Sequence, residues 1–228
     1  MKTTTIIINE KPFTYQNEVG DPYKFEPMSP ENGEKILDLT ARLLQECGIP
    51  FFLAFGTLLG AVREGYFIKG DEDVDIIITD EDKLYKSIPY LYKNGLLINR
   101  IFKSALYTFH TEDRKGHIDL YVMHEFHNSI WRMRCICIHE KAMPKKYFQN
   151  IVSGEYTLGG KQYPYPKHPE RLLEWWYGKD WNIPLSKKGR YEVFSRRMWK
   201  YPKKIIQKLR KKLRKLFFTT NDTTHNTL

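Results

Sequence analysis

The spacing of apolar and polar positions predicts a chain that mixes strands with helices. Apolar runs typical of buried strands occupy residues 51–55, 74–78, 96–102, 105–110, 117–123 and 130–138. The Gly159-Gly160 pair is expected to form a hairpin turn between two further short strands. Residues 1–30 carry four prolines and lack a sustained period, so we expect coil and short strands there.

Helical spacing of apolar residues begins after Ser29-Pro30, a pair suited to an N-cap and a first helical turn, and ends at Gly48. Other helices are predicted at 81–94, 168–177 and 203–218, and a short one after a turn at Gly56-Thr57. Because strands and helices do not alternate as regular βαβ units, the pattern favours an α+β domain over a doubly wound one.

The length of 228 residues suits one domain, which we expect at residues 32–185. An N-terminal extension (1–31) would precede it and a basic C-terminal tail (186–228) would follow. The net charge of +10 comes from that tail, since eleven basic residues and no acidic one lie between Arg196 and Lys215. The rest of the chain is nearly neutral, with 26 basic and 27 acidic residues.

The tail also has an apolar stripe at helical spacing, formed by Ile205, Ile206, Leu209, Leu213, Leu216 and Phe217. A cationic helix with such a stripe is typical of segments that lie on an anionic membrane surface. Docking of the stripe on the domain is the alternative. Nucleic-acid binding is disfavoured, because the body has no net positive charge and the tail lacks interleaved aromatic residues.

Cysteines and the N-terminus favour a cytoplasmic protein. Three cysteines without a CxxC pair suit a reducing compartment, and the start of the chain has too few consecutive apolar residues for a signal-peptide core. The longest uncharged run, 47–62, is shorter than a membrane span and is interrupted by Pro50, Gly56 and Gly60. With the tail, these features predict a cytoplasmic protein that is peripheral on the inner face of the membrane.

The candidate chemistry lies in Asp73-Val74-Asp75-Ile76, where residues two apart share one face of a strand. Two adjacent carboxylates repel unless a cation separates them, and oxygen ligands of this kind suit Mg²⁺ or Mn²⁺. Asp119, an acid between apolar residues of another predicted strand, is the best candidate for a third ligand. It could instead be a core acid paired with an arginine.

Gly56, Thr57 and Arg63 are candidates for binding substrate phosphates. A glycine allows close approach of the backbone, the start of a helix favours an anion, and an arginine can form a bidentate phosphate contact. Arg63 could equally be an ordinary surface residue. For Asp71 and Glu72, we favour a solvated loop.

The run from Gly56 to Arg63, the following Gly65-Tyr66-Phe67-Ile68 and the acidic Asp71–Ile76 segment closely resemble the signature of the LicD family. The later segment 169–184 is similar to the closing tyrosine-glycine and tryptophan-proline element of that family, which includes bacterial phosphocholine transferases and the fukutin proteins. The resemblance implies a nucleotidyltransferase-type mixed β-sheet with flanking helices. It also implies transfer of an alcohol phosphate, such as phosphocholine, from a CDP-alcohol to a glycan or glycolipid hydroxyl, with release of CMP.

Under this resemblance Asp73, Asp75 and Asp119 would be catalytic residues and ligands of Mg²⁺ or Mn²⁺, and Asp119 would also be the base for the acceptor hydroxyl. Gly56, Thr57 and Arg63 would hold the donor phosphates. The main alternative is an NTP-dependent nucleotidyltransferase that acts on a small molecule with the same metal site.

Overall fold

The computed structural model describes residues 2–17, 27–125, 132–134, 143–148 and 150–184. The predicted strand at 130–138 is therefore described only at β9 (Arg132–Arg134), and the predicted helix at 203–218 lies outside the described residues. Contacts between Cα atoms group Met1–Asn182 into one unit and Ile183–Leu228 into another.

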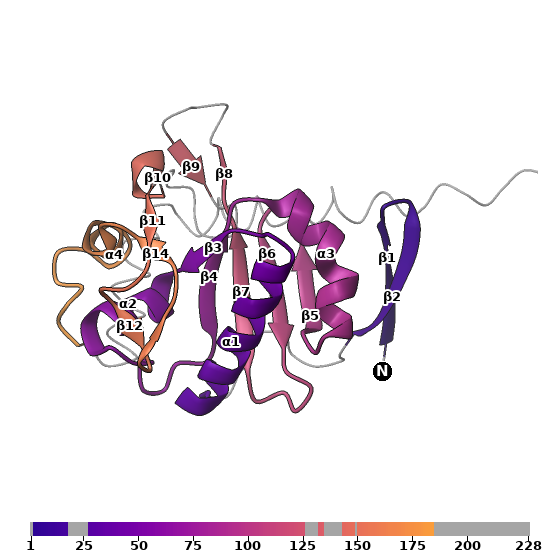
Figure 1. The fold of residues 1–228 in the computed structure, drawn as a ribbon, viewed down its shortest axis with the longest axis horizontal. Coiled ribbons are helices and arrows are strands. Elements are labelled where there is room, and N and C mark those ends of the chain that lie inside the picture. The colour runs from indigo at the N-terminus through magenta and orange to yellow at the C-terminus, as the bar shows by residue number, and fades with distance from the viewer. Residues whose placement is uncertain (1, 18–26, 126–131, 135–142, 149, 185–228) are drawn as a thin grey trace, which may run out of the picture. The chain divides into compact units, whose positions relative to one another are not determined.

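A five-stranded mixed sheet forms the centre of the first unit, as Figure 1 shows. In sheet order its strands are β3 (Phe51–Leu53), β4 (Val74–Ile78), β7 (His117–Val122), β6 (Leu106–His110) and β5 (Leu97–Phe102). β4 and β7 run parallel, and the other neighbouring pairs run antiparallel. These strands and the intervening helices confirm the predicted α+β class.

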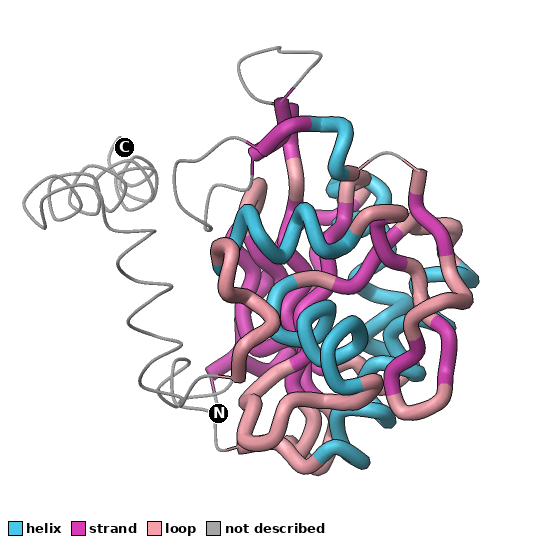
Figure 2. Tube along the Cα trace, turned by 90° about the vertical axis from the view of Figure 1, so that its left-hand side faces the viewer, coloured by secondary structure: helices cyan, strands magenta, loops and turns pink. Residues whose placement is uncertain are grey.

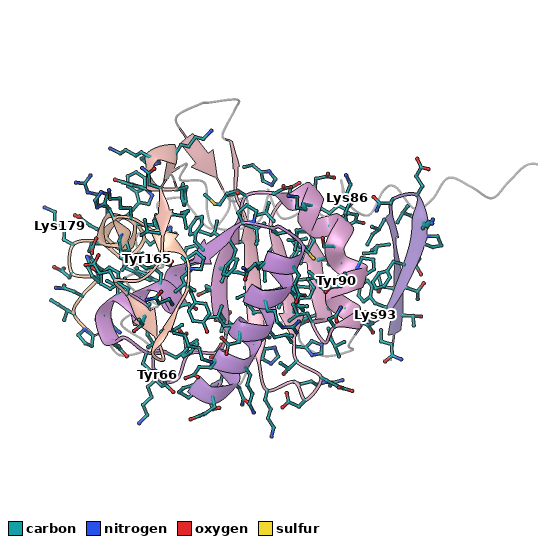
Figure 3. All side chains as sticks on the ribbon, viewed as in Figure 1. Tyr66, Lys86, Tyr90, Lys93, Tyr165 and Lys179 are labelled. Carbon is teal, nitrogen blue, oxygen red and sulfur yellow. The ribbon has the colours of Figure 1, made fainter. Side chains whose placement is uncertain are left out.

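Two helices, α1 (Pro30–Glu46) and α3 (Glu81–Lys93), contact the sheet and each other. The predicted cap of α1 is confirmed, because Ser29 Oγ accepts a hydrogen bond from the amide of Asn32 at 3.3 Å. The apolar side of α1 is fully buried, and Tyr90 of α3, labelled in Figure 3, donates to Glu46 at 2.8 Å. The spacing of apolar residues in these segments therefore predicts their buried faces correctly.

The two faces of the sheet differ in chemistry. Val74 and Ile118 are opposite one another in the ladder between β4 and β7, and both are fully buried. The side that they share faces α1, because a Cβ added to Gly116 would lie 3.0 Å from Ile36 Cβ. Asp75 and Asp119 occupy the alternate positions, so their side chains point to the opposite face.

The predicted turn at Gly56-Thr57 is wrong, because these residues belong to the first turn of α2 (Phe55–Glu64). The chain passes from β3 into this helix through Ala54 alone, and Phe55 adopts a positive φ of 40°. Figure 2 views the molecule from the side on which α2 and α4 (Pro169–Tyr177) lie. Trp176 of α4 packs on Phe55, with ring centroids 4.2 Å apart.

The N-terminal segment forms a hairpin of two seven-residue strands, β1 (Lys2–Ile8) and β2 (Lys11–Asn17), so its strands are longer than predicted. It is attached to α3 by the hydroxyl of Tyr85, which donates to the Ile7 carbonyl at 3.2 Å.

Short elements complete the described residues. They are β8 (His124–Glu125), β10 (Met143–Pro144), the 3₁₀ turn η1 (Lys145–Tyr147), β11 (Ile151–Val152), β12 (Thr157–Leu158), β13 (Lys161–Gln162) and β14 (Tyr165–Pro166). The β12–β13 pair confirms the hairpin predicted at Gly159-Gly160. None of the helices in this part of the chain has the length and apolar character needed to cross a bilayer.

Candidate active site

Asp75 and Asp119 lie directly opposite each other on the parallel strands β4 and β7. Both are buried, with 7% and 3% of their surface exposed. Asp73 immediately precedes β4, two positions before Asp75, and is half-buried. The fold therefore gathers the three aspartates that the sequence singled out at one place on the sheet.

The aspartates raise one another's pKa values. Burial, followed by the charges of Asp119 and Asp71, raises the pKa of Asp73 to about 8. Burial and the neighbouring Asp73 raise the pKa of Asp75 well above its ordinary value. Such a cluster favours either bound protons or a bound cation, because several unscreened negative charges close together destabilise the fold.

Asp119 is held by hydrogen bonds on both of its oxygens. Thr108 Oγ1 donates to Oδ1 at 2.5 Å, and Arg100 Nη2 and the Tyr121 hydroxyl each lie 3.4 Å from Oδ2. Burial is the largest influence and raises the pKa of Asp119, although these three partners lower it. Asp119 therefore has the arginine partner considered in the sequence analysis, and it also belongs to the aspartate cluster.

The start of α2 contacts this cluster. The Gly56 amide donates to Asp75 Oδ2 at 3.2 Å, and Thr57 Oγ1 accepts from the Asp75 amide at 2.8 Å. Both contacts attach the helix to β4, and the positive end of the helix lies beside a carboxylate. Gly56 and Thr57 thus contact Asp75, whereas their role in binding phosphate remains a prediction.

Asp71 is half-buried in the loop before β4, and its charge acts on Asp73 and Asp75. A Cβ added to Gly56 would lie 2.6 Å from Asp71 Oδ2 and 3.5 Å from Asp75 Oδ2. A Cβ at this position would displace the Asp71 carboxylate, whereas it would make only an ordinary contact with Asp75. The amide of Met28 donates to the Asp71 carbonyl at 2.8 Å, which ties the acidic loop to the segment before α1. This contact joins segments that are distant in the sequence, so it cannot be predicted from the residues around Asp71.

Arg63 is not brought to the aspartates. It lies in the last turn of α2, seven residues beyond Gly56, and its guanidinium pairs with the neighbouring Glu64. A helix rises about 1.5 Å per residue, so Gly56 and Arg63 are about 10 Å apart along α2. Arg100, which the sequence analysis did not select, is the described arginine that contacts Asp119.

The residues present fit a hard divalent cation in their chemistry. Their donor atoms are carboxylate oxygens, and the raised pKa values show that positive charge would be favourable among them. Within the described residues, however, no group of three or more acid, histidine or cysteine side chains is arranged as a complete metal site. A cation at this place would complete its coordination with water or with substrate oxygens, as is usual for Mg²⁺.

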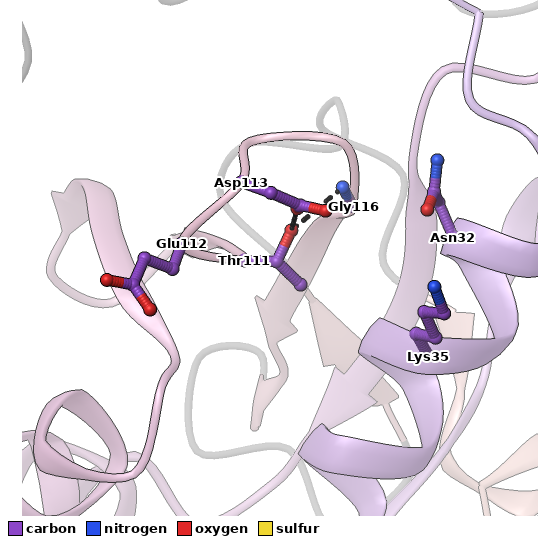
Figure 4. A pocket seen from close by; sticks show the side chains of 6 residues that line it. All are labelled: Asn32, Lys35, Thr111, Glu112, Asp113 and Gly116. Atoms are coloured by element: carbon purple, nitrogen blue, oxygen red, sulfur yellow. Dashed lines mark hydrogen bonds between the residues drawn. The ribbon is translucent and has the colours of Figure 1, made fainter.

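A polar cavity of about 410 Å³ lies next to the start of β7. Figure 4 shows its lining, which comes from the first turns of α1 and from the loop between β6 and β7: Asn32, Lys35, Thr111, Glu112, Asp113 and Gly116. The loop is braced by hydrogen bonds from Thr111 Oγ1 to Asp113 at 2.6 Å and from the Gly116 amide to Thr111 Oγ1 at 3.1 Å. Amide, ammonium and carboxylate groups on a braced loop suit a ligand rich in hydroxyl groups.

A five-stranded mixed sheet with aspartates on adjacent parallel strands, beside the N-terminus of a helix, defines a domain of the nucleotidyltransferase type. The family model described as "LicD/FKTN/FKRP, nucleotidyltransferase domain" matches residues 48–168, which is more than half of the sequence. The chain belongs to the LicD family.

Among curated proteins, the chain is similar to ribitol-5-phosphate transferase FKTN of Macaca fascicularis and of Homo sapiens, with 26% identity over 171 residues in each case. The Mus musculus protein is 24% identical over 164 residues. Each alignment covers 68% of this chain and 34% of the relative. The chain thus matches about a third of the length of these relatives.

Two solved structures have a related arrangement of elements. A lincomycin-bound lincosamide antibiotic adenylyltransferase, LnuA, gives a TM-score of 0.46 with 13% identity, covering 74% of this chain and 98% of that one. The antibiotic-resistance factor ANT(2'')-Ia in solution gives a TM-score of 0.47 with 11% identity, covering 83% and 95%.

Proposed function

We propose that the protein transfers an alcohol phosphate from a CDP-alcohol to a hydroxyl group of a glycan or glycolipid and releases CMP. Membership of the LicD family supports the reaction class, and the relatives named as ribitol-5-phosphate transferases support an alcohol phosphate as the transferred group. The observation that carries the proposal is the opposed pair Asp75 and Asp119, which lies within the matched residues with Asp73 beside it.

The proposed reaction is a substitution at the phosphorus that carries the alcohol. The acceptor oxygen forms a bond to this phosphorus, the bond from phosphorus to the oxygen bridging to CMP breaks, and CMP leaves with that electron pair. The hydroxyl proton of the acceptor goes to the carboxylate of Asp119, whose pKa is raised above its ordinary value by burial. Positioning and charge neutralisation supply most of the catalysis in reactions of this kind.

Asp73 and Asp75 would hold Mg²⁺ or Mn²⁺, with Asp119 as a further ligand. When bound, the cation would neutralise charge on the donor phosphates and on the leaving oxygen. Gly56 and Thr57, in the first turn of α2 beside the aspartates, would contact a donor phosphate. Arg63 pairs with Glu64 in the last turn of α2, and the phosphate contact predicted for it stays a prediction.

The test is to incubate the protein with Mg²⁺ and CDP-choline, CDP-glycerol or CDP-ribitol, and in parallel with ATP or CTP. We expect release of CMP from at least one CDP-alcohol and none in the presence of a chelator. Asp73→Asn and Asp75→Asn should abolish release while remaining folded, whereas Asp82→Asn, a surface change on α3, should not. Pyrophosphate release from a nucleoside triphosphate would favour the nucleotidyltransferase alternative, and full activity in both aspartate variants would exclude the proposed mechanism.

A further inference from the structure

A row of polar side chains crosses the sheet from β5 to β4. Arg100 is opposite Thr108, Thr108 is opposite Asp119, and Asp119 is opposite Asp75. Residues directly opposite one another on neighbouring strands project from the same face of the sheet. Arg100 and Thr108 therefore belong to the face that carries the aspartates.

A β-bulge in β5 places Arg100 in this row. Ile98 is opposite Phe109, but the next pair is Arg100 with Thr108, so one additional residue, Asn99, is inserted in β5. In an uninterrupted ladder Asn99 would be opposite Thr108, and Arg100 would project from the face that packs on the helices. Bulges commonly redirect a side chain next to an active site. Here the bulge brings a guanidinium to the buried carboxylates.

The hydrogen bonds in the row have a fixed direction. Arg100 Nε donates to Thr108 Oγ1 at 2.9 Å, and Thr108 Oγ1 lies 2.5 Å from Asp119 Oδ1. A guanidinium is only a donor, so the threonine hydroxyl accepts from it and directs its single proton to the aspartate. Thr108 is fully buried, and its β-branched side chain has few rotamers. The carboxylate of Asp119 is thereby held in one orientation.

We propose that Thr108 and Arg100 are positioning residues, which orient the Asp119 carboxylate toward Asp75 for cation binding and for proton acceptance. This inference rests on the proposed function of the same site. Residues that hydrogen-bond to a metal ligand fix its orientation, and their loss typically costs about 10- to 100-fold in metal affinity or activity. Neither residue need contact the substrate for this role.

The test compares Thr108→Val, which keeps the shape and removes the hydroxyl, with Thr108→Ser, which restores it. Mn²⁺ affinity, measured by titration without substrate, should fall about 10-fold or more in Thr108→Val and recover in Thr108→Ser. CMP release should show a lower kcat with little change in the KM for the CDP-alcohol. Thr40→Val is the matched control, because Thr40 is also fully buried and its hydroxyl has no hydrogen-bond partner among the described residues.

The inference is overturned if Thr108→Val binds Mn²⁺ as tightly as the unchanged protein, or if Thr108→Ser is as impaired as the valine variant. If Thr108→Val does not fold, the same Mn²⁺ titration of Arg100→Gln tests the inference instead. The Arg100 side chain is 15% exposed. Absence of Mn²⁺ binding by the unchanged protein also overturns it. Failure of every CDP-alcohol as a donor would contradict the proposed function alone, since the Mn²⁺ titration does not depend on a donor.

Discussion

At the scale of single residues, the aspartate cluster couples proton binding to folding. In the unfolded chain Asp73 has an ordinary carboxyl pKa, whereas in the folded protein its pKa is about 8. The folded state therefore binds the proton more tightly, and this contribution to stability is lost as the pH rises through 8. A divalent cation would replace the proton as the source of positive charge among these carboxylates.

We predict that the metal-free protein is more stable at pH 6 than at pH 9, and that Asp73→Asn reduces this difference. Melting temperatures measured with a chelator at both pH values test the prediction. Asp82→Asn, which changes an exposed carboxylate paired with Lys86, serves as the control and should keep the difference of the unchanged protein. An equal pH dependence in the Asp73→Asn protein would show that the cluster does not control it.

A second residue-scale prediction concerns Asp119 as the proposed base. Asp119→Asn keeps the size of the side chain but cannot accept the proton, so kcat for CMP release should fall by ~10²-fold or more. If the residue were only a buried acid, the same change would lower the melting temperature and leave kcat nearly intact. Measuring kcat and the melting temperature on one preparation separates these outcomes.

The sequence predicted some of these residues for a definite physical reason and missed others. Asp73 and Asp75 could be found because the two-residue period of a strand is visible locally. Arg100 could not, because its face depends on a bulge, and neither the bulge nor the partner strand can be read from residues 97–102. The closeness of Asp71 to the cluster could not be predicted for a similar reason, since its position depends on contacts with Gly56 and Met28.

At the scale of elements, the packing of α2 depends on two close contacts, one at each of its interior glycines. A Cβ at Gly60 would lie 2.5 Å from the backbone carbonyl oxygen of Tyr66, whereas one at Gly56 would meet the carboxylate of Asp71 at 2.6 Å. A backbone atom cannot move without shifting the chain, but a carboxylate can rotate away. The two glycines therefore have different roles, one in packing and one at the site.

We predict opposite profiles for alanine at these two positions. Gly60→Ala should lower the free energy of unfolding by about 1–3 kcal/mol, as overpacking usually does. Gly56→Ala should change the stability less and reduce CMP release and Mn²⁺ affinity more, because it displaces Asp71 from the cluster. Denaturant unfolding and Mn²⁺ titration of both variants provide the measurements. Equal loss of metal binding in the two variants would contradict a specific role of Gly56.

The elements themselves were predicted well where their periodicity was long. The helices α1 and α3 and the strands β4 to β7 occur close to the predicted positions because each buries one periodic apolar face. The start of α2 was misplaced, since a turn was expected at Gly56-Thr57, whereas the helix already begins at Phe55. That beginning depends on packing of Phe55 against Tyr121 and Trp176, which lie far away in the sequence.

At the scale of the whole molecule, the basic C-terminal tail remains a prediction from the sequence, because residues 185–228 lie outside the described residues. The cationic residues of its predicted helix, 203–218, are Lys203, Lys204, Lys208, Arg210, Lys211, Lys212, Arg214 and Lys215. Each contributes about 1 kcal/mol near an anionic membrane surface, and the apolar stripe adds burial in the headgroup region. A membrane-bound enzyme would meet glycan acceptors that are carried on lipids, which agrees with the proposed reaction.

We predict that the full-length protein co-sediments with vesicles containing anionic lipid and that a truncation at about Pro202 does not. The truncation leaves Met1–Asn182 intact, so the shortened protein should still release CMP from the donor with a soluble acceptor. Vesicles of neutral lipid control for the apolar stripe alone, and binding should weaken as salt screens the charges. Equal sedimentation of both forms, or no binding by either at low ionic strength, would show that the tail does not attach the protein to membranes and would favour docking of its stripe on protein instead.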